Sequence, residues 1–268
     1  MINSNVKIGI KNTQKISVYY FSGTGNTQII ARRIVDVFKS KGFLASLINI
    51  ETVDRISIND NEIIGLGFPV AEFTTYPIVF DFLEQIENVN GNYVFAFDTM
   101  GGTSFWGIMG RMKDILDKKG FQTIGFREFK MPPNIFLKFP KKWAKKRIAK
   151  SNKRAEDFVD QLVIGDVTWN KVPVVSNLMS TFSQNLFKIS KFKWHQKYLK
   201  MKVNRSKCIA CGICAAKCPV GNISIGKIAE INDQCQYCFR CVGICPELAI
   251  SGIASPSTLH YLAEGAHF

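Results

Sequence analysis

Eight cysteines confined to one short segment are the feature that most constrains this chain. All of them lie between positions 208 and 245 of the 268 residues, in two copies of the pattern C-x2-C-x2-C-x3-C-P, and the second copy follows the first at an offset of 27. The repeat extends past the cysteines, since Ile223 and Ser224 recur as Ile250 and Ser251. It predicts a duplicated supersecondary unit with pseudo-two-fold symmetry. Such confinement indicates a local inorganic site and not a disulfide framework.

The spacing within each copy fits two cubes of iron and sulfide. Three thiolates separated by two residues can wrap one cube, while the fourth, three residues further on, ligates the other cube. The predicted ligands are Cys208, Cys211, Cys214 and Cys245 for cluster one, and Cys235, Cys238, Cys241 and Cys218 for cluster two. Structural zinc is the alternative, but a tetrahedral zinc site takes two separated pairs of ligands, and here the third cysteine follows the second after only two residues.

Residues 203 to about 253 resemble a bacterial ferredoxin with two [4Fe–4S] clusters. All eight cysteine ligands of that family's motif are present without substitution. The resemblance implies a small α+β domain that transfers one electron at a time, at low potential, between its two clusters.

The preceding 150 residues have the pattern of an α/β domain. Short apolar runs alternate with amphipathic stretches from Lys15 to about Ile164, as expected for helices that cover a parallel sheet. The five predicted strands are Ile16 to Ser22, Leu44 to Ile50, Glu62 to Pro69, Tyr93 to Thr99 and Gln122 to Phe129. Apolar residues recur at helical spacing between them, as at Ile30, Ile34, Val37 and Phe38, at Val79, Phe82, Leu83 and Ile86, and at Met109, Met112, Ile115 and Leu116.

The loop after the first strand has the composition of a phosphate site. It reads Ser22-Gly23-Thr24-Gly25-Asn26-Thr27, so hydroxyls and backbone N–H groups converge at the start of the first helix. The alternative is that the loop is no more than a good helix cap. A dinucleotide fingerprint does not fit, because Gln28 stands at the position of the third glycine, and the chain has no G-K-[ST] triphosphate motif.

This loop resembles the flavodoxin signature [ST]-x-T-G-x-T, with Ser22, Thr24, Gly25 and Thr27 at the matching positions. The resemblance implies a doubly wound five-stranded parallel sheet of order 2-1-3-4-5, with FMN phosphate in this loop and the isoalloxazine ring between two further loops. Their predicted contacts are Pro69, Val70, Ala71, Phe73 and Tyr76 in one loop and Thr99, Met100, Gly101, Gly102, Phe105 and Trp106 in the other. The second loop lacks the Gly-Asp and Tyr pattern usual in short flavodoxins. Any of the four aromatics could therefore stack on the ring, and ordinary packing is the alternative for each.

These features divide the chain into five predicted parts. Residues 1–14 form an N-terminal extension, 15–165 the FMN-binding domain, 166–202 a basic aromatic connector, 203–255 the two-cluster domain, and 256–268 a C-terminal tail. We expect the connector to be ordered, because a flexible linker rarely carries as many aromatic residues as this one does.

The charge is unevenly distributed. Lys and Arg number 35 against 21 Asp and Glu, a formal net charge of +14. Bound clusters and FMN phosphate would lower it to roughly +8. Nine basic residues and no acid lie between Lys138 and Arg154, and no acid occurs from Val167 to Lys227. A solvated helix face, a docking site for an acidic redox protein such as a ferredoxin or flavodoxin, and nucleic-acid binding are the three interpretations. No groove-reading motif supports nucleic acid.

Other signals are negative or weak. Met1 to Lys15 is polar and lacks the apolar stretch of a signal peptide, and no apolar run is long enough to span a bilayer, so we expect a cytoplasmic protein. His195, His260 and His267 are isolated, and no hydrolytic motif is present. Met131-Pro132-Pro133-Asn134 breaks the chain after the fifth strand, which gives either a simple loop or a loop that brings Asn134 to the domain interface.

The whole chain resembles anaerobic fusion proteins in which a flavodoxin-like FMN domain precedes a two-cluster ferredoxin domain. The resemblance predicts an electron-transfer flavoprotein that relays single electrons between the clusters and FMN and exchanges them with an external low-potential partner. One alternative is an FMN-dependent oxidoreductase that acts on a small substrate such as a quinone or uses NAD(P)H. Another is a flavin-free ferredoxin on a flavodoxin-like scaffold. The choice between carrier and enzyme stays open, as do the donor, the acceptor and the oligomeric state.

Overall fold

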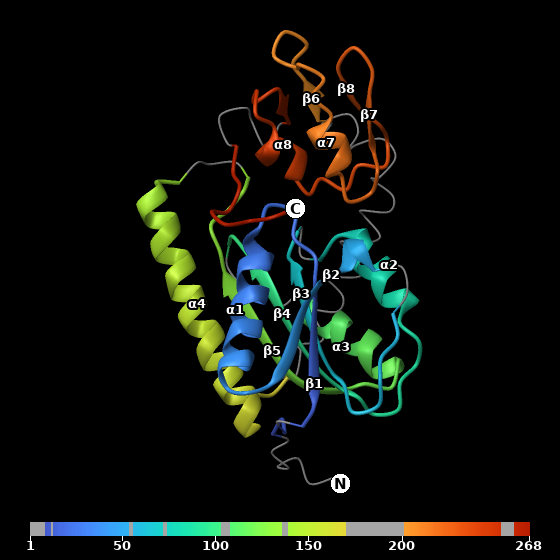
Figure 1. Cartoon of the computed structure of the whole chain (residues 1–268), viewed down its shortest axis with the longest axis vertical. Coiled ribbons are helices and arrows are strands. Elements are labelled where there is room, and N and C mark those ends of the chain that lie inside the picture. Colours follow the sequence, from blue (N-terminus) through green and yellow to red (C-terminus); the bar gives the residue numbers. More distant parts are fainter. Residues whose placement is uncertain are drawn as a thin grey trace.

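The computed structural model of the chain describes residues 9–11, 13–53, 56–71, 74–102, 108–135, 139–169, 201–252 and 260–268. An α/β unit carries a smaller cysteine-rich unit at one end of its sheet (Figure 1). The last residues of the chain run between the two units, beside the start of α1 (Figure 1). The predicted domain limits stay predictions, because much of the connector lies outside the described residues.

The α/β unit is built on a five-stranded parallel sheet of order β2-β1-β3-β4-β5. The strands are β1 (Lys15–Tyr20), β2 (Leu44–Asn49), β3 (Ile63–Pro69), β4 (Tyr93–Met100) and β5 (Gln122–Lys130). The predicted fold class and strand order are confirmed, and the strand ends differ from the predicted ones by one or two residues. The largest difference is at β1, which ends at Tyr20 and not Ser22, because the chain turns there into the glycine-containing loop.

Helices cover both faces of this sheet (Figure 1). One face packs against α1 (Asn26–Ser40) and α4 (Lys141–Ile164), the other against α2 (Pro77–Gln85) and α3 (Met109–Lys118), and a short 3-10 turn, η1 (Ile50–Thr52), follows β2. Side chains alternate along β4, so Phe95 and Phe97 join the first core while Val94 and Ala96 join the second. Because both faces of the sheet are covered, the central strands β1, β3 and β4 are buried along almost their whole length.

Helix α4 joins two adjacent stretches of the sequence. The basic stretch from Lys138 to Arg154 continues into a helix-like segment from Ala155 to Ile164. The structure has one continuous helix of 24 residues over Lys141–Ile164. Its second half buries Phe158, Val159 and Leu162 against the sheet, whereas the lysines of its first half are mostly exposed. The burial of one end therefore anchors a helix whose basic end projects past the core.

The cysteine-rich unit repeats in structure as it does in sequence. Its elements are β6 (Lys202–Val203), α7 (Ile213–Ala216), β7 (Ile223–Ile225), β8 (Ala229–Ile231), α8 (Arg240–Ile244) and β9 (Ile250–Ser251). Elements that are 27 residues apart are equivalent: β6 corresponds to β8, α7 to α8 and β7 to β9. Antiparallel pairing joins β6 to β9 and β7 to β8, so each small sheet takes one strand from each copy. Left-handed backbone conformations recur at the same offset, at Ala210 and Tyr237, Gly212 and Phe239, and Gly221 and Leu248.

The first part of the predicted connector packs on the α/β unit. Trp169 is buried, its ring lies 5.1 Å from the ring of Phe126, and its indole N–H donates to the carbonyl of Met109 at 3.2 Å. Residues 170–200, with the other predicted connector aromatics, lie outside the described residues.

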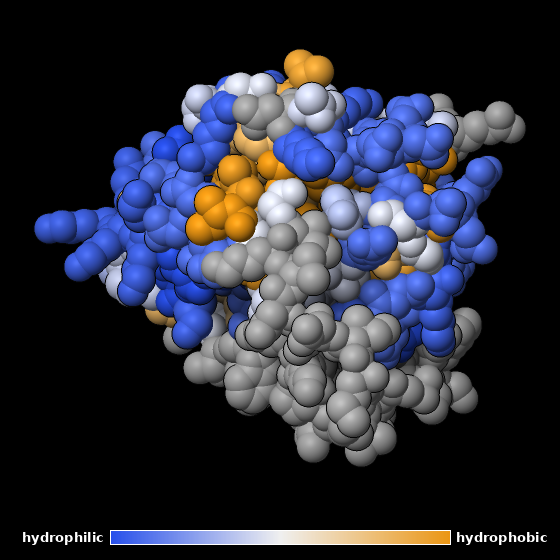
Figure 2. Space-filling view, turned by 90° about the horizontal axis from the view of Figure 1, so that it is seen from below, coloured by the Kyte–Doolittle hydropathy of each residue, from blue (hydrophilic) through white to orange (hydrophobic). Residues whose placement is uncertain are grey.

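Figure 2 shows the end of the α/β unit that faces away from the cysteine-rich unit. Hydrophilic residues cover most of the described surface there, with some hydrophobic residues exposed among them. Leu44 begins β2 and Ile164 ends α4 at this end of the sheet, and both are exposed. In the part of the chain that the structure describes, no helix has both the length and the apolar composition that crossing a bilayer requires.

The buried Glu62 makes the stability of the α/β unit depend on pH. Burial alone would raise the pKa of this carboxyl, but hydrogen bonds from Ser17, Asn59 and Lys15 lower it below its ordinary value. A lowered folded-state pKa contributes stability above the unfolded pKa of about 4.3, and that stability is lost as the pH falls through the folded value. Glu62→Gln should flatten the dependence of the unfolding temperature on pH below about pH 4. Equal slopes for variant and wild type would contradict this role.

Candidate functional site

The loop between β1 and α1 leaves the first N–H groups of α1 available for an anion. Gly25 occupies the N-cap position with a left-handed φ of 94°, and α1 has no side-chain cap. Ser22 Oγ instead accepts from the N–H of Gly25 at 3.1 Å, within the loop. The interpretation of this loop as an ordinary side-chain cap is therefore not what the structure shows. Uncapped N–H groups together with the helix dipole form an anion site of the kind that binds phosphate.

This loop forms one wall of an open pocket at the carboxyl ends of the strands. The residues predicted for FMN that line it are Ser22, Gly23, Thr24, Asn26, Thr27, Pro69, Val70, Tyr76, Thr99, Met100 and Gly101. Gly25, Ala71 and Gly102 were also predicted, but they are not among the lining residues. Phe73, Phe105 and Trp106 lie outside the described residues. Tyr76 is thus the one predicted aromatic that the described part of the chain brings to the pocket.

Hydrogen bonds join the loops around this pocket. The hydroxyls of Thr27 and Thr99 are 2.7 Å apart, which links the first loop to the end of β4. Asn134 Nδ2 donates to Thr24 Oγ1 at 3.1 Å, and Asn26 Nδ2 donates to the carbonyl of Pro132 at 2.9 Å. The turn after β5 therefore positions Asn134 at the pocket and is more than a simple loop. The two prolines are the sequence signal for that turn.

The thiols predicted for cluster one lie around a second cavity, of about 350 Å³. Cys208, Cys211 and Cys214 come from the first copy of the repeat and Cys245 from the second, and all four line this cavity. The structure thus brings three thiols of the first copy together with one thiol of the second, as the predicted ligand set requires. Because the walls of this cavity are almost entirely apolar side chains, it suits a cluster that is bound through its thiolate ligands.

The thiols predicted for cluster two form a more buried group. Burial, and next the neighbouring thiols of Cys238, Cys235 and Cys218, raise the pKa of Cys241 well above its ordinary value. Burial likewise raises the pKa of the Cys238 thiol to about 12. Thiolates in such surroundings need compensating positive charge, which the iron atoms of a cluster provide.

Backbone N–H groups point at the sulfur atoms in the same way in both copies. The N–H of Asn222 donates to Cys218 Sγ at 3.3 Å, and the equivalent N–H of Ala249 donates to Cys245 Sγ at 3.3 Å. Such bonds stabilise thiolate ligands and tune cluster potentials. Across the described ranges, no three His, Cys, Asp or Glu side chains form a group suited to a single metal ion. The two sets of four thiols suit polynuclear clusters.

Comparison with known families agrees with both parts of this site. Residues 18–143 match the flavodoxin family, and residues 200–246 match the family of 4Fe-4S dicluster domains. The chain joins a flavodoxin domain to a dicluster ferredoxin domain. The α/β unit is called the flavodoxin domain and the cysteine-rich unit the ferredoxin domain below.

Similar proteins cover only part of this chain. A ferredoxin of Pyrobaculum islandicum is 38% identical over 58 residues, which are 20% of this chain and 54% of that protein. An uncharacterized protein of Methanocaldococcus jannaschii is 39% identical over 54 residues, 19% of this chain and 20% of that protein. The chain thus spans about half the length of the first relative and a fifth of the second. A solved Streptococcus pneumonia flavodoxin has 17% identity and a TM-score of 0.42, over 55% of this chain and 96% of that one.

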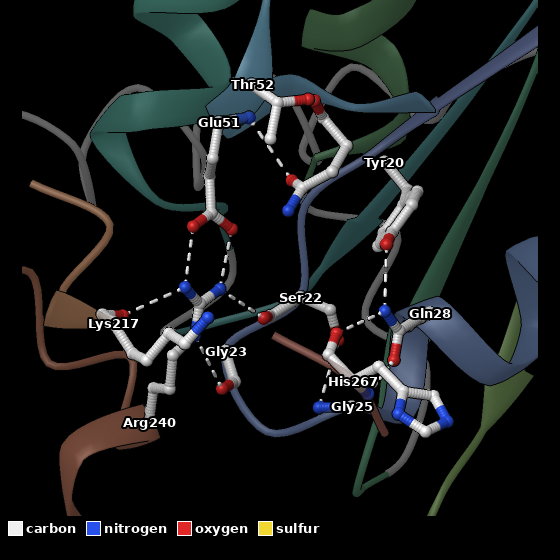
Figure 3. A network of polar contacts seen from close by, with 11 residues as sticks. Tyr20, Ser22, Gly23, Gly25, Gln28, Glu51, Thr52, Lys217, Arg240 and His267 are labelled. Atoms are coloured by element: carbon white, nitrogen blue, oxygen red, sulfur yellow. Dashed lines mark hydrogen bonds and ion pairs between the residues drawn. The ribbon is translucent and has the colours of Figure 1, made fainter. Parts of the chain in front are cut away.

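One arginine of the ferredoxin domain reaches residues 22–27 of the flavodoxin domain, the predicted phosphate loop (Figure 3). The guanidinium of Arg240, only 3% exposed, donates to the carbonyls of Ser22 at 2.8 Å and Gly23 at 3.4 Å. It also forms a two-pronged ion pair with Glu51, with N–O distances of 2.6 and 2.5 Å, and donates to the carbonyl of Lys217 at 3.0 Å. No pattern in the sequence marked Arg240 or Glu51, because their ion pair joins residues of two different domains.

The C-terminal residues hold the same loop from another side. The N–H of Ala263 donates to the carbonyl of Thr24 at 2.9 Å, and the hydroxyl of Tyr261 donates to Asn26 Oδ1 at 2.7 Å. A methyl group at Gly25 would lie 2.3 Å from the methyl carbon of Ala266. Gly25 is thus required both for its left-handed φ and for this close approach.

Pairs of cysteine variants test the crossed ligand sets. Two four-iron clusters predict about eight irons per chain. Cys211→Ala and Cys245→Ala remove ligands of the same predicted cluster, although they lie in different copies of the repeat. The double variant Cys211→Ala/Cys245→Ala should therefore retain about four irons.

The matched control removes one ligand from each predicted cluster. Cys211→Ala/Cys218→Ala changes two cysteines of the same copy and should leave almost no iron. Iron and acid-labile sulfide analysis of the anaerobically reconstituted chain measures both variants. The reverse result, with iron retained only in this second variant, would assign each cluster to a single copy of the repeat.

Proposed function

We propose that this protein relays single electrons between two [4Fe–4S] clusters and a bound FMN, and that it exchanges them with an external low-potential redox partner. Its flavodoxin and ferredoxin domains imply electron transfer. The observation that carries the proposal is the position of Cys238. This predicted ligand of cluster two lines the same pocket as the phosphate loop.

The residues around the pocket fit FMN. The hydroxyls of Ser22, Thr24 and Thr27 and the N-terminus of α1 would hold the phosphate. The segments from Pro69 to Val70 and from Thr99 to Gly101, with Tyr76, would border the ring. When bound, FMN supplies a centre that accepts or gives either one or two electrons, whereas each cluster passes one at a time. The chain would thus be an adapter between one- and two-electron chemistry.

The contact between the domains explains why the two cofactor sites share one chain. A methyl group at Gly23 would lie 2.3 Å from the carbonyl oxygen of Cys238, so the phosphate loop and the cluster-two loop are in van der Waals contact. A tether and a preformed interface replace the diffusional encounter that separate flavodoxin and ferredoxin molecules require. Transfer between the two sites would therefore be intramolecular.

Removing hydroxyls from the phosphate loop tests the flavin site. Ser22→Ala/Thr24→Ala should weaken FMN binding by at least about a hundredfold, because each lost hydrogen bond to a charged group contributes about 1.5–3 kcal/mol. Fluorescence titration of the reconstituted chain measures the change, and iron content should stay constant. Ser224→Ala, on the exposed β7, is the control. Unchanged affinity would place the phosphate elsewhere, and a wild-type chain that binds no flavin would support the scaffold alternative.

Stopped-flow reduction separates the carrier from an FMN-dependent oxidoreductase. We expect reduced ferredoxin to reduce the FMN-loaded chain rapidly, and NAD(P)H to reduce it slowly or not at all. Rapid reduction by NAD(P)H would favour the oxidoreductase alternative. The proposed partner is an acidic redox protein, so the rate with ferredoxin should fall as ionic strength rises. A rate that does not change with salt would assign the exposed lysines of α4 to an ordinary solvated surface.

A further inference from the structure

The two copies of the cysteine repeat have opposite surroundings. We call residues 208–214 the outer loop and residues 235–241 the inner loop; the offset of 27 relates them. Arg240 of the inner loop corresponds to Ile213 of the outer loop, and Gln236 corresponds to Ile209. Arg240 is 3% exposed, whereas Ile209 is 64% and Ile213 is 42% exposed. Two loops with the same ligand motif thus present different chemistry at equivalent positions.

The inner loop is in contact with the flavodoxin domain along its length. Gln236 Oε1 accepts from the N–H of Ile78 at 3.1 Å, at the start of α2. Cys238 lines the flavin pocket, and its carbonyl lies against Gly23. Arg240 then binds the backbone of the phosphate loop and the carboxylate of Glu51. This loop is therefore largely occupied by its contact with the flavodoxin domain.

The outer loop is free, with an apolar rim around the cluster-one thiols. Ile209, Ile213 and Ile225 line the cluster-one cavity and are exposed, and the ligand Cys211 is exposed among them. Large aliphatic side chains at the mouth of a cofactor site gain stability only if another surface covers them. The apolar rim indicates an interface that forms and dissociates.

We propose that the outer loop is the docking site for the external electron carrier, and that the inner loop delivers to FMN. This inference rests on the proposed relay and adds its order: carrier, cluster one, cluster two, FMN. Arg240 is a positioning residue, because it holds the inner loop against the phosphate loop without itself binding a cluster. Its counterpart Ile213 serves the opposite purpose, since it leaves the outer loop open to a partner.

The occupant that fits this rim is an acidic one-electron carrier protein with an apolar surface around its own cofactor. Aliphatic side chains form the centre of the proposed contact. The exposed basic residues Arg205, Lys207 and Lys227 flank the rim in the sequence, and Glu247 is the one acidic residue among the described residues that line the cavity. The acid-free stretch from Val167 to Lys227 includes the whole outer loop. An acidic margin on the partner would complement these charges and steer its approach.

Each step of the proposed relay transfers one electron. A reduced carrier molecule loses one electron to cluster one and leaves oxidised, and the electron passes through cluster two. Two carrier molecules, each oxidised by one electron, supply the pair that, with protons from water, reduces one FMN. Reduction of the FMN requires no reductant besides the carrier.

Two variants, one on each loop, test this order. For the outer loop, Ile209→Glu/Ile213→Glu should raise the dissociation constant of oxidised acidic two-[4Fe–4S] ferredoxin about tenfold or more, measured by calorimetry, because it introduces charge into the apolar centre of the contact. Ile164→Glu, equally exposed at the far end of α4, is the matched control and should bind ferredoxin as the wild type does. In stopped-flow mixing with reduced ferredoxin, the outer-loop variant should slow both the cluster phase and the flavin phase.

For the inner loop, Arg240→Met/Glu51→Gln removes both charges and leaves neither one unpaired in the interface. We expect ferredoxin binding and the cluster phase to stay unchanged while the flavin phase slows and FMN dissociates about tenfold more readily. Hydrogen exchange of the backbone over residues 22–28 should rise in the same variant, independently of any cofactor activity. Arg240→Lys keeps the positive charge and should therefore show smaller changes in the flavin phase, in FMN dissociation and in hydrogen exchange than the double variant does.

Three outcomes overturn the inference. Ferredoxin binding that is unaffected by the isoleucine changes but lost in Lys142→Glu/Lys146→Glu would move the docking site to α4. A dimer in sedimentation that the isoleucine changes dissociate would make a second copy of this chain the occupant. A flavin phase unchanged by loss of Arg240 would remove its positioning role. If clusters are reduced but flavin never follows in the wild type, the relay itself fails, while calorimetry still decides the docking site.

Discussion

The contact between Arg240 and the phosphate loop is the interaction on which the arrangement of this molecule depends. One buried guanidinium satisfies two loop carbonyls, a carboxylate from η1 and a carbonyl of its own domain. A buried ion pair adds little net stability over apolar packing, because desolvation offsets most of the attraction. It does require one orientation, since any other would leave a buried charge unpaired. The pair therefore specifies how the ferredoxin domain sits on the flavodoxin domain.

The C-terminal residues depend on that orientation. The ring of Phe268 lies 4.3 Å from the guanidinium of Arg240, and the backbone of His267 exchanges two hydrogen bonds with the side chain of Gln28. The phosphate loop is thus held by its own helix, by the ferredoxin domain and by the end of the chain. Preorganised N–H groups bind an anion without the cost of ordering the loop, which is the property that a flavin phosphate site needs.

Much of the fold could be predicted from the sequence, because its signals are local. The three central strands, β1, β3 and β4, are mostly apolar and buried, as burial on both faces of a parallel sheet requires. The edge strands β2 and β5 are more polar and partly exposed. The composition of the loop from Ser22 to Thr27 indicates an anion site, and the cysteine repeat predicts a duplicated supersecondary unit. In helix α4 the basic half is mostly exposed, and burial of Phe158 and Val159 anchors the other end.

The parts of the candidate site that could be predicted are those whose residues lie together in one continuous segment of the sequence. The sequence by itself determined the cysteine motif, the phosphate loop and the α/β fold, since spacing and periodicity fix which backbone each segment can form. Only the tertiary structure decided which cysteine loop adjoins the flavin pocket. The two loops share their cysteines and differ at all four positions between them, among which are Arg240 against Ile213 and Gln236 against Ile209. A side chain's role at an interface depends on a partner that is distant in sequence, here Glu51 and Gly23. No local pattern encodes that pairing, because the energy of a buried charge is set by what surrounds it in space.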